Sequence, residues 1–237
     1  MSTMQNIILS DDRQRSLAFY LAMEEFVASN VEGEAFFVWQ SEPTVIYGRN
    51  QVLENEVNMA YCQEHEVEVV RRKSGGGCVY SDKGNIMVSY VSERGMVNEV
   101  FERYLDALTD FLCSVGVPAE KSGRNDILVN GRKVSGNAFH QLPDRSIVHG
   151  TLLYSTDFDA LQQALLPPVE KLRRHGVESV RQRVMNLSEV LQMPIDDLKK
   201  AIVDHFCDSE MVLDTDDIRT IEEMEKEYPV ISNKEDK

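Results

Sequence analysis

Hydrophobic residues follow helical spacing in some segments of the chain and strand-like spacing in others. Apolar residues three or four positions apart predict helices over 13–29, which we expect to be amphipathic, and over 97–115. Pro194 opens another predicted helix, whose apolar stripe is made by Ile195, Leu198, Ile202 and Phe206. Short apolar runs that end in polar turn residues predict strands over 35–40, 44–47, 67–71 and 86–91, with a short helix over 59–65.

The strongest turn signal is Asn130-Gly131, because both residues tolerate the positive φ angles of a type I′ turn. It predicts a hairpin of strands over 126–129 and 132–140, and a turn over 142–145 leads to a further strand over 146–154. The pattern is helical after Asp157 and fades beyond about residue 210, and we expect the last ten residues to be frayed. Strands outnumber a simple β-α-β alternation. We therefore predict an α+β fold, with a mixed β-sheet and flanking helices in one domain over 1–237.

Composition excludes several classes of partner. The 237 residues, 42% of them hydrophobic, are enough to bury a core without disulfides or metals. The net charge of −15 argues against a nucleic-acid polymer or an anionic membrane surface as the main partner. No apolar run approaches the roughly 18 residues of a membrane-spanning helix. The four cysteines form no CxxC pair, which favours a reducing, cytoplasmic location over a disulfide or zinc framework.

A glycine-rich segment over 71–80 is the first candidate for chemistry. It reads Arg71-Arg72-Lys73-Ser74-Gly75-Gly76-Gly77-Cys78-Val79-Tyr80. Consecutive glycines let the backbone come close to a ligand and present several N–H groups to one anion. The adjacent arginines are planar forks for phosphate or carboxylate. The alternative is a flexible surface loop.

The predicted hairpin is the second candidate. A regular pairing sets Leu128 opposite Lys133 and Asp126 opposite Ser135, so Asp126, Lys133 and Ser135 share one face of the sheet. The two charged residues are then diagonal neighbours, roughly 7–8 Å apart at the backbone. One interpretation is a solvated face with a weak ion pair. The other is a lysine that stabilises an anionic intermediate.

His149-Gly150-Thr151, on the next predicted strand, is the third candidate, with Arg145 in the turn before it. Glycine inside a strand marks close approach by a ligand or by another part of the chain. A single histidine is more often structural than catalytic. His149 gains interest because it follows the Lys133 hairpin directly.

Five segments, in order along the chain, resemble the lipoate–protein ligases and the related lipoyl and octanoyl transferases. They read PTVIYGRNQ, RRKSGGGCVYSDKGN, GRNDILVNGRKVSG, HGTLLYSTDFDAL and KLRRHGVESVRQRVMNLSEV. The resemblance runs from about residue 10 to about 205 and implies a fold shared with biotin protein ligase. It implies that lipoate and Mg-ATP give lipoyl-AMP and pyrophosphate, and that a lysine of an acceptor protein then attacks the adenylate. The implied acceptors are the lipoyl domains of 2-oxo acid dehydrogenase E2 subunits and the glycine-cleavage H protein.

The resemblance also implies roles for individual residues. Lys133 contacts both ATP and the lipoyl carboxylate and is the expected catalytic residue. Asp126 lies near the phosphates and is the candidate magnesium ligand. The remaining residues of the expected nucleotide and lipoyl-AMP site are Arg72, Ser74, Gly75, Gly76, Gly77, Cys78, Val79, Tyr80, Asn85 and Asn125, followed by Ser135, Gly136, Arg145, His149 and Gly150.

Three departures from the family pattern leave alternatives open. Ser81 stands where many relatives have histidine. Cys78 stands where alanine or threonine is usual, as a structural substitution or as the site of an acyl-cysteine. The chain stops in IEEMEKEYPVISNKEDK, where full-length ligases continue into a small accessory domain. We therefore expect a self-sufficient ligase, a catalytic subunit that needs an accessory protein, or a transferase that uses a preformed acyl donor without ATP.

Basic residues are concentrated in the segments that carry the resemblance. Residues 71–85, 121–150 and 167–183 each have a net charge of +3, which leaves −24 for the rest of the chain. A focused basic pocket accommodates a single nucleotide even in an acidic protein. We expect the acidic stretch over 210–237 to lie away from this basic region if the acceptor domain is itself acidic.

Overall fold

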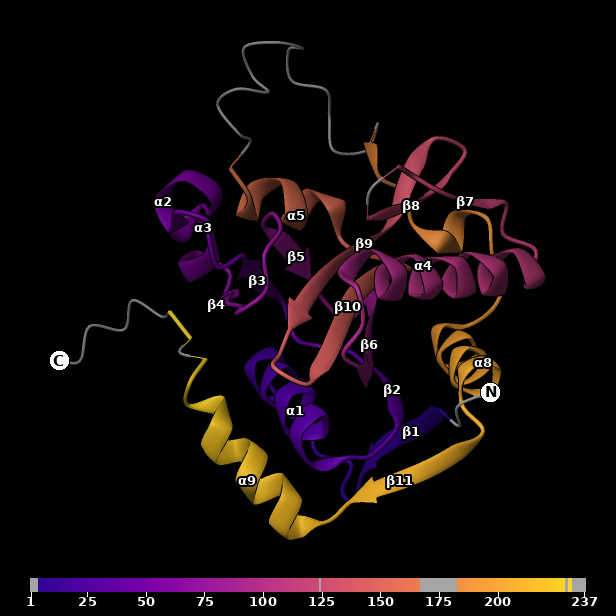
Figure 1. Cartoon of the computed structure of the whole chain (residues 1–237). Coiled ribbons are helices and arrows are strands. Elements are labelled where there is room, and N and C mark those ends of the chain that lie inside the picture. The colour runs from indigo at the N-terminus through magenta and orange to yellow at the C-terminus, as the bar shows by residue number, and fades with distance from the viewer. Residues whose placement is uncertain (1–3, 124, 167–182, 229, 232–237) are drawn as a thin grey trace, which may run out of the picture.

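The computed structural model describes residues 4–123, 125–166, 183–228 and 230–231, and a mixed eight-stranded β-sheet forms its centre (Figure 1). The strand order is β11-β1-β2-β6-β10-β9-β8-β7. β1 is parallel to both of its neighbours, and the remaining pairs are antiparallel. The strands are β1 (Met4–Leu9), β2 (Glu34–Trp39), β6 (Asn85–Glu93), β7 (Ala119–Lys121), β8 (Asp126–Val129), β9 (Arg132–Gln141), β10 (Arg145–Leu153) and β11 (Ser209–Leu213).

A smaller sheet of order β4-β3-β5 packs beside the large one. Its strands are β3 (Thr44–Tyr47), β4 (Glu68–Arg71) and β5 (Val79–Ser81). The described helices are α1 (Leu17–Asn30), α2 (Leu53–Glu56), α3 (Met59–Glu64), α4 (Val97–Ser114), α5 (Phe158–Ala164), α8 (Ile195–Phe206) and α9 (Thr215–Glu225), with a 3₁₀ turn, η1 (Leu187–Glu189). The predicted α+β class, a mixed sheet with flanking helices, is confirmed.

Helices cover both faces of the large sheet. α1 and α9 lie on one face, where Phe37 and Trp39 of β2 join the core. α4 and α8 lie on the other, with Phe36 of the same strand. The alternation of Phe36 and Phe37 follows from the two-residue period of a strand. α1 was expected to be amphipathic, but it is buried on nearly every side because it lies between the sheet and α9.

The hairpin has the predicted turn but a different register. Asn130 and Gly131 have φ angles of 51° and 75°, as the Asn-Gly pair predicts. Leu128 lies opposite Lys133, but Asp126 pairs with Gly136 because a β-bulge interrupts the ladder between Ile127 and Leu128. Because of the extra residue, the side chains that follow it on β9 point to the face of the sheet opposite to the one predicted.

The C-terminal part of the chain is more regular than expected. β11 extends the large sheet beside β1, and α9 follows it. Asp214 opens α9 with a capping box shared with Asp217. The prediction of a weakly patterned tail from about residue 210 was therefore wrong. α9 is mostly polar, but its apolar residues lie on one side, where Ile218 and Ile221 are buried.

The expected fraying of the last ten residues is contradicted where they are described. Tyr228 is only 4% exposed, and the Ile231 N–H donates to the Val69 carbonyl on β4, 2.8 Å away. Residue 229 and residues 232–237 lie outside the described residues, as does most of the KLRRHGVESVRQRV segment. Among the described residues, none of the helices has the length and apolar character to cross a membrane.

Candidate active site

A pocket lies between α1, the glycine segment and the central strands β6, β9 and β10. One part of its wall is apolar and is made by Leu21, Trp39, Ile46 and Met87. The rest of the wall is mixed. Its polar side chains are Arg72, Asn125, Lys133, Asn137, His149 and Thr151, and its other members are Gly76, Gly77, Cys78, Val79, Gly136, Ala138 and Gly150.

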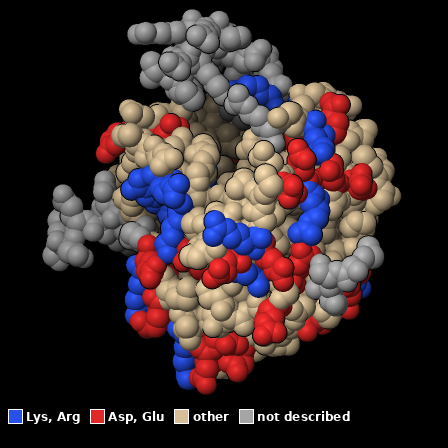
Figure 2. All heavy atoms as spheres, in the orientation of Figure 1, with Lys and Arg blue, Asp and Glu red and all other residues tan. Residues whose placement is uncertain are grey.

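Basic and acidic side chains are distributed unevenly over the surface of the molecule. Figure 2 shows a recess in the upper half of one face, with basic side chains near it. Acidic side chains gather at the lower end, where α9 lies in Figure 1. The two charges also meet, because Glu227 of the acidic C-terminal stretch reaches Lys73 of the glycine segment at 2.7 Å. The expectation that this stretch lies away from the basic region was wrong at this point.

Arg72 organises the glycine segment from within. Its side chain is 5% exposed, and its guanidinium donates to the carbonyls of Gly75, Gly77 and Ile46, with 2.6 Å for the contact to Gly77. Burial lowers the pKa of Arg72, and carbonyl acceptors compensate for that desolvation. The segment is therefore a fixed part of the pocket wall and not a free surface loop.

Two kinds of glycine are found in this segment. Gly76 has a φ of +96°, and a Cβ there would lie 2.9 Å from the Arg72 guanidinium. The protein itself requires Gly76. A Cβ at Gly77 would meet no described atom within 4 Å. Since Gly77 lines the pocket, we infer that it leaves room for a ligand rather than for a neighbouring residue.

Lys133 lines the pocket and pairs with Asp126, which is not among the lining residues. Lys133 Nζ lies 2.9 Å from Asp126 Oδ1, and both side chains remain about one-third exposed. The lysine passes directly over Gly136, where a Cβ would lie 2.5 Å from Nζ. The diagonal pairing of these residues is present as expected, whereas Ser135, turned by the bulge, is fully buried on the opposite face.

His149 lies at the centre of a buried hydrogen-bond chain. Its Nε2 is 2.8 Å from Ser74 Oγ, and its Nδ1 is 2.8 Å from Glu24 Oε2. Glu24 is 3% exposed and also accepts from Ser89 Oγ at 2.6 Å. Ser89 in turn accepts from Trp39 Nε1 at 2.9 Å. The chain links α1 and the central strands to the residue that precedes the three glycines.

Comparison with known proteins assigns this architecture to a family. The family described as the lipoyl protein ligase A/B catalytic domain matches residues 16–207. The chain belongs to this family. Lipoate–protein ligase 1 of Staphylococcus aureus is 41% identical over 188 residues, which cover 77% of this chain and 57% of that protein. The lipoate-protein ligase LplJ of Bacillus subtilis is 35% identical over 219 residues, which cover 89% and 64%. The chain thus spans about 60% of the length of these relatives.

Solved structures of lipoate–protein ligases have the same fold. A bipartite ligase from Thermoplasma acidophilum has a TM-score of 0.83 at 24% identity, covering 95% of this chain and 93% of that one. A lipoate-protein ligase A bound with ATP has a TM-score of 0.81 at 22% identity, covering 94% of both chains. These TM-scores establish a common fold, and at such low identities the roles of this chain's own residues have to be argued from their geometry.

Within the family fold, several expected site residues lie behind the pocket wall. Asn85 is fully buried, donates to Thr151 Oγ1 and accepts from Thr156, so it supports the wall from behind. Tyr80, on β5, points into the core of the small sheet, where burial raises its pKa. Ser81 is also fully buried, between Ser41 and Met87. Gly75 contributes its carbonyl to Arg72 and is not among the lining residues.

Two predictions on β10 need correction. Arg145 does not reach the pocket, because its guanidinium donates to the carbonyls of Val31 and Gly33 at 3.1 and 2.5 Å. Gly150 lines the pocket through its backbone atoms. A Cβ on Gly150 would point to the opposite face and lie 1.8 Å from Asn137 Oδ1. The close approach that the glycine signals comes from the protein itself.

Cys78 lines the pocket but lacks the environment of an activated thiol. Burial raises its pKa to about 12, and the nearby Arg72 only partly opposes this effect. The thiol is therefore protonated at neutral pH. This geometry favours the structural substitution over an acyl-cysteine.

Sequence reasoning missed Glu24 and the apolar wall. Glu24 occupies a position on the otherwise apolar face that includes Leu17 and Leu21. An acid at such a position is a signal of a buried polar partner, but its partner His149 lies 125 residues away in the chain. The pairing becomes visible only when the fold brings the two together.

Proposed function

We propose that the chain is an ATP-dependent lipoate–protein ligase. It activates lipoate as lipoyl-AMP and transfers the lipoyl group to a lysine of an acceptor protein. The observation that carries the proposal is the composition of the pocket. The pocket is lined by a lysine, a glycine backbone with open space and a buried arginine, and also by the apolar side chains of Leu21, Trp39, Ile46 and Met87. Such a pocket suits a carboxylate with an apolar tail joined to a nucleotide.

Activation requires that negative charge be held in place. The lipoate carboxylate attacks the α-phosphorus of ATP, and pyrophosphate leaves as the new acyl–phosphate bond forms. We assign Lys133 to the carboxylate and α-phosphate oxygens, because its ammonium presents three donors at the edge of the pocket. The backbone at Gly76 and Gly77 lies against the nucleotide.

Transfer uses the same groups. The acceptor amine attacks the acyl carbon, the bond to the phosphate breaks, AMP leaves, and the amine loses a proton. Lys133 stabilises the developing charge on the acyl oxygen and on the leaving phosphate. No side-chain nucleophile takes part, in agreement with the raised pKa of Cys78.

Magnesium enters this proposal as the ion that accompanies ATP. Among the described residues there is no group of three or more His, Cys, Asp or Glu side chains arranged to hold a metal. A single carboxylate together with substrate phosphates is a common arrangement for Mg²⁺. Asp126, beside Lys133, is the residue that fits this role, and the ion would neutralise phosphate charge there.

The proposed acceptors are the lipoyl domains of 2-oxo acid dehydrogenase E2 subunits and the glycine-cleavage H protein. Support comes from the Thermoplasma relative, which was characterised as a bipartite ligase together with its E2 lipoyl domain. That relative is described as a bipartite ligase, which supports a separate accessory protein as a further proposed partner.

The test is a mass measurement on the acceptor. This protein, lipoate, Mg-ATP and an apo lipoyl domain should give the lipoyl mass increment on the domain's lysine, and omission of ATP should abolish it. Product formed only from added lipoyl-AMP would indicate a required accessory protein. Product formed from octanoyl carrier protein without ATP would replace the ligase by an octanoyl transferase.

A further inference from the structure

Two neighbouring residues of α1 hold two neighbouring residues of the glycine segment. Glu24 reaches Ser74 through His149. Glu25 accepts directly from Lys73, with 2.8 Å between Oε2 and Nζ. Lys73 stands between Arg72, which lines the pocket, and Ser74, so its contacts hold the glycine segment beside the pocket.

The C-terminal part of the chain completes the surroundings of Lys73. Lys73 Nζ lies 4.7 Å from the centre of the Tyr228 ring and 2.7 Å from Glu227 Oε2. The Tyr228 hydroxyl donates to Glu25 Oε1 at 2.6 Å. We call Glu25, Lys73, Glu227 and Tyr228 the C-terminal clasp.

The buried members dominate the clasp. The Glu227 side chain is 63% exposed, whereas that of Glu25 is 14% exposed and Tyr228 as a whole only 4%. Solvent screens the exposed pair, so Glu25 and Tyr228 make the stronger contacts. Burial disfavours the charge of Lys73, but its hydrogen bonds to Glu227 and Glu25 outweigh this effect and raise its pKa.

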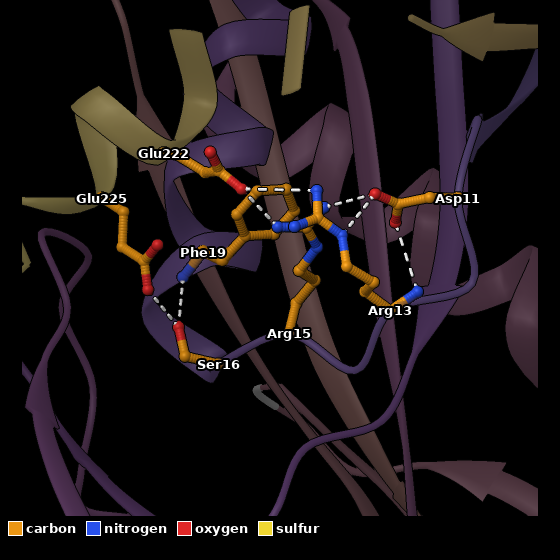
Figure 3. Close-up of polar contacts among 7 residues, drawn as sticks. All are labelled: Asp11, Arg13, Arg15, Ser16, Phe19, Glu222 and Glu225. Carbon is orange, nitrogen blue, oxygen red and sulfur yellow. Dashed lines mark hydrogen bonds and ion pairs between the residues drawn. The ribbon is translucent and has the colours of Figure 1, made fainter. Parts of the chain in front are cut away.

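Two anchors hold the clasp in place. On one side, Val230 bridges to Val70 and Ile231 donates to Val69, on the strand that leads into the glycine segment. On the other side, α9 is fastened to the start of α1 (Figure 3). There, Arg15 Nη1 lies 2.5 Å from Glu222, and Ser16 donates to Glu225.

We propose that the C-terminal clasp positions the glycine segment for nucleotide binding, with Glu25 and Tyr228 as positioning residues that do not touch the ligand. The proposal rests on the proposed function, because it takes ATP as the ligand of the segment. It extends the functional unit beyond residues 16–207, which the family match covers, to residues 227–228. A contact that only stabilised the fold would leave the ATP dependence of the reaction unchanged.

The test compares conservative variants of the full chain. Tyr228→Phe keeps the ring over Lys73 and removes the hydroxyl that donates to Glu25. Lys73→Met removes the cation but keeps an apolar stem, and Lys73→Arg restores the charge. The matched control is Glu223→Gln, which breaks an exposed ion pair with Lys226 at the end of α9 and removes no member of the clasp.

The main readout is the rate of lipoyl-AMP formation as a function of ATP concentration. Tyr228→Phe and Lys73→Met should raise KM for ATP by about fivefold to tenfold, as expected for loss of a partly buried hydrogen bond. Their kcat should change by less than about twofold, because a displaced loop weakens ground-state and transition-state binding alike. Lys73→Arg should recover most of the loss. KM values equal to that of Glu223→Gln would overturn the proposal.

Amide hydrogen exchange separates failure of the clasp from failure of the ligase assignment. The peptide over residues 70–78 should exchange faster in Tyr228→Phe than in Glu223→Gln, whether or not the protein makes lipoyl-AMP. If the wild type neither makes lipoyl-AMP nor transfers the lipoyl group from added lipoyl-AMP, the proposed function fails, and the exchange result alone decides on the clasp. Unchanged exchange in Tyr228→Phe would then reject it.

Discussion

Lys133 reaches across its hairpin to Asp126, with 2.9 Å between Nζ and Oδ1, and it does so over a glycine. A Cβ at Gly136 would occupy the path of the lysine side chain. The pair is about one-third exposed, so it contributes little to stability. Its value lies in holding the ammonium at the edge of the pocket, where the proposed reaction develops negative charge.

Replacing Lys133 should therefore remove activity and leave the fold intact. We expect Lys133→Met to lower kcat for lipoyl transfer by roughly 10²–10³-fold, the usual cost of removing one charge-stabilising donor. Arg132→Met is the matched control, because Arg132 pairs with Glu189 outside the pocket. Equal kcat values for the two variants, measured with lipoyl-AMP as donor, would contradict the assignment.

Gly77 offers a test of ligand approach that does not depend on folding. The protein leaves open space at its Cβ position, so Gly77→Ala should unfold at the same urea concentration as the wild type. The added methyl would instead meet the ligand, and KM for ATP should rise roughly tenfold or more. Gly123→Ala, also in open space but outside the pocket, should change neither quantity. A Gly77→Ala enzyme with normal KM would show that this glycine does not face the nucleotide.

Gly150 should behave in the opposite way. A methyl there would lie 1.8 Å from Asn137 Oδ1, so either the side chain or the strand has to shift. We expect Gly150→Ala to destabilise the protein by about 1–3 kcal/mol, the usual cost of overpacking a core. Urea unfolding measures this. Asn137→Ala removes the clashing oxygen, so Gly150→Ala should lower the free energy of unfolding less in an Asn137→Ala background than in the wild type. Equal losses in the two backgrounds would exclude the clash.

Cys78 should react slowly with alkylating reagents. Burial raises the pKa of its thiol to about 12. The reactive thiolate is therefore scarce at pH 7 and becomes common only as the pH approaches this pKa. Cys113 is exposed and serves as the internal reference. Peptide mass spectrometry after iodoacetamide treatment should show Cys113 modified first, and Cys78→Ala should retain transfer activity. Rapid labelling of Cys78 would reopen the acyl-cysteine alternative.

Segments with strong local patterns could be predicted closely from the sequence. The helix expected over 97–115 is α4 (Val97–Ser114), and the hairpin has its expected turn. α9 was missed because a polar surface helix buries only a narrow stripe, and its place in the fold depends on contacts with α1. The amphipathic signal is present in the sequence, because Ile218, Ile221 and Met224 recur at three-residue spacing, but it is carried by few apolar residues among many acidic ones.

The residues of the candidate site also differ in how far the sequence predicts them. The motif residues Arg72, Lys133 and His149 were found because they are chemically distinctive in their segments, and they do line one pocket. Ser135 was placed on the wrong face because a single bulge reverses the alternation of a strand, and nothing local in β9 marks it. Arg145 was misassigned because its carbonyl partners, Val31 and Gly33, are more than 100 residues away.

The attachment of α9 predicts how stability depends on pH. Hydrogen bonds from Arg13 lower the pKa of Asp11, and the N-cap hydrogen bonds from the Asp217 and Asp216 amides lower that of Asp214. A carboxylate whose pKa is lower in the folded state stabilises the protein above its unfolded value of about 3.8. That contribution is lost as pH falls through the lower pKa of the folded state.

Urea midpoints should therefore decline below about pH 4, and they should decline less steeply in Asp11→Asn and Asp214→Asn. Asp144→Asn, in the β9–β10 turn, is the control for the loss of one acidic side chain outside α9 and its attachment. An unchanged slope in the first two variants would show that these carboxylates do not couple the α9 attachment to pH.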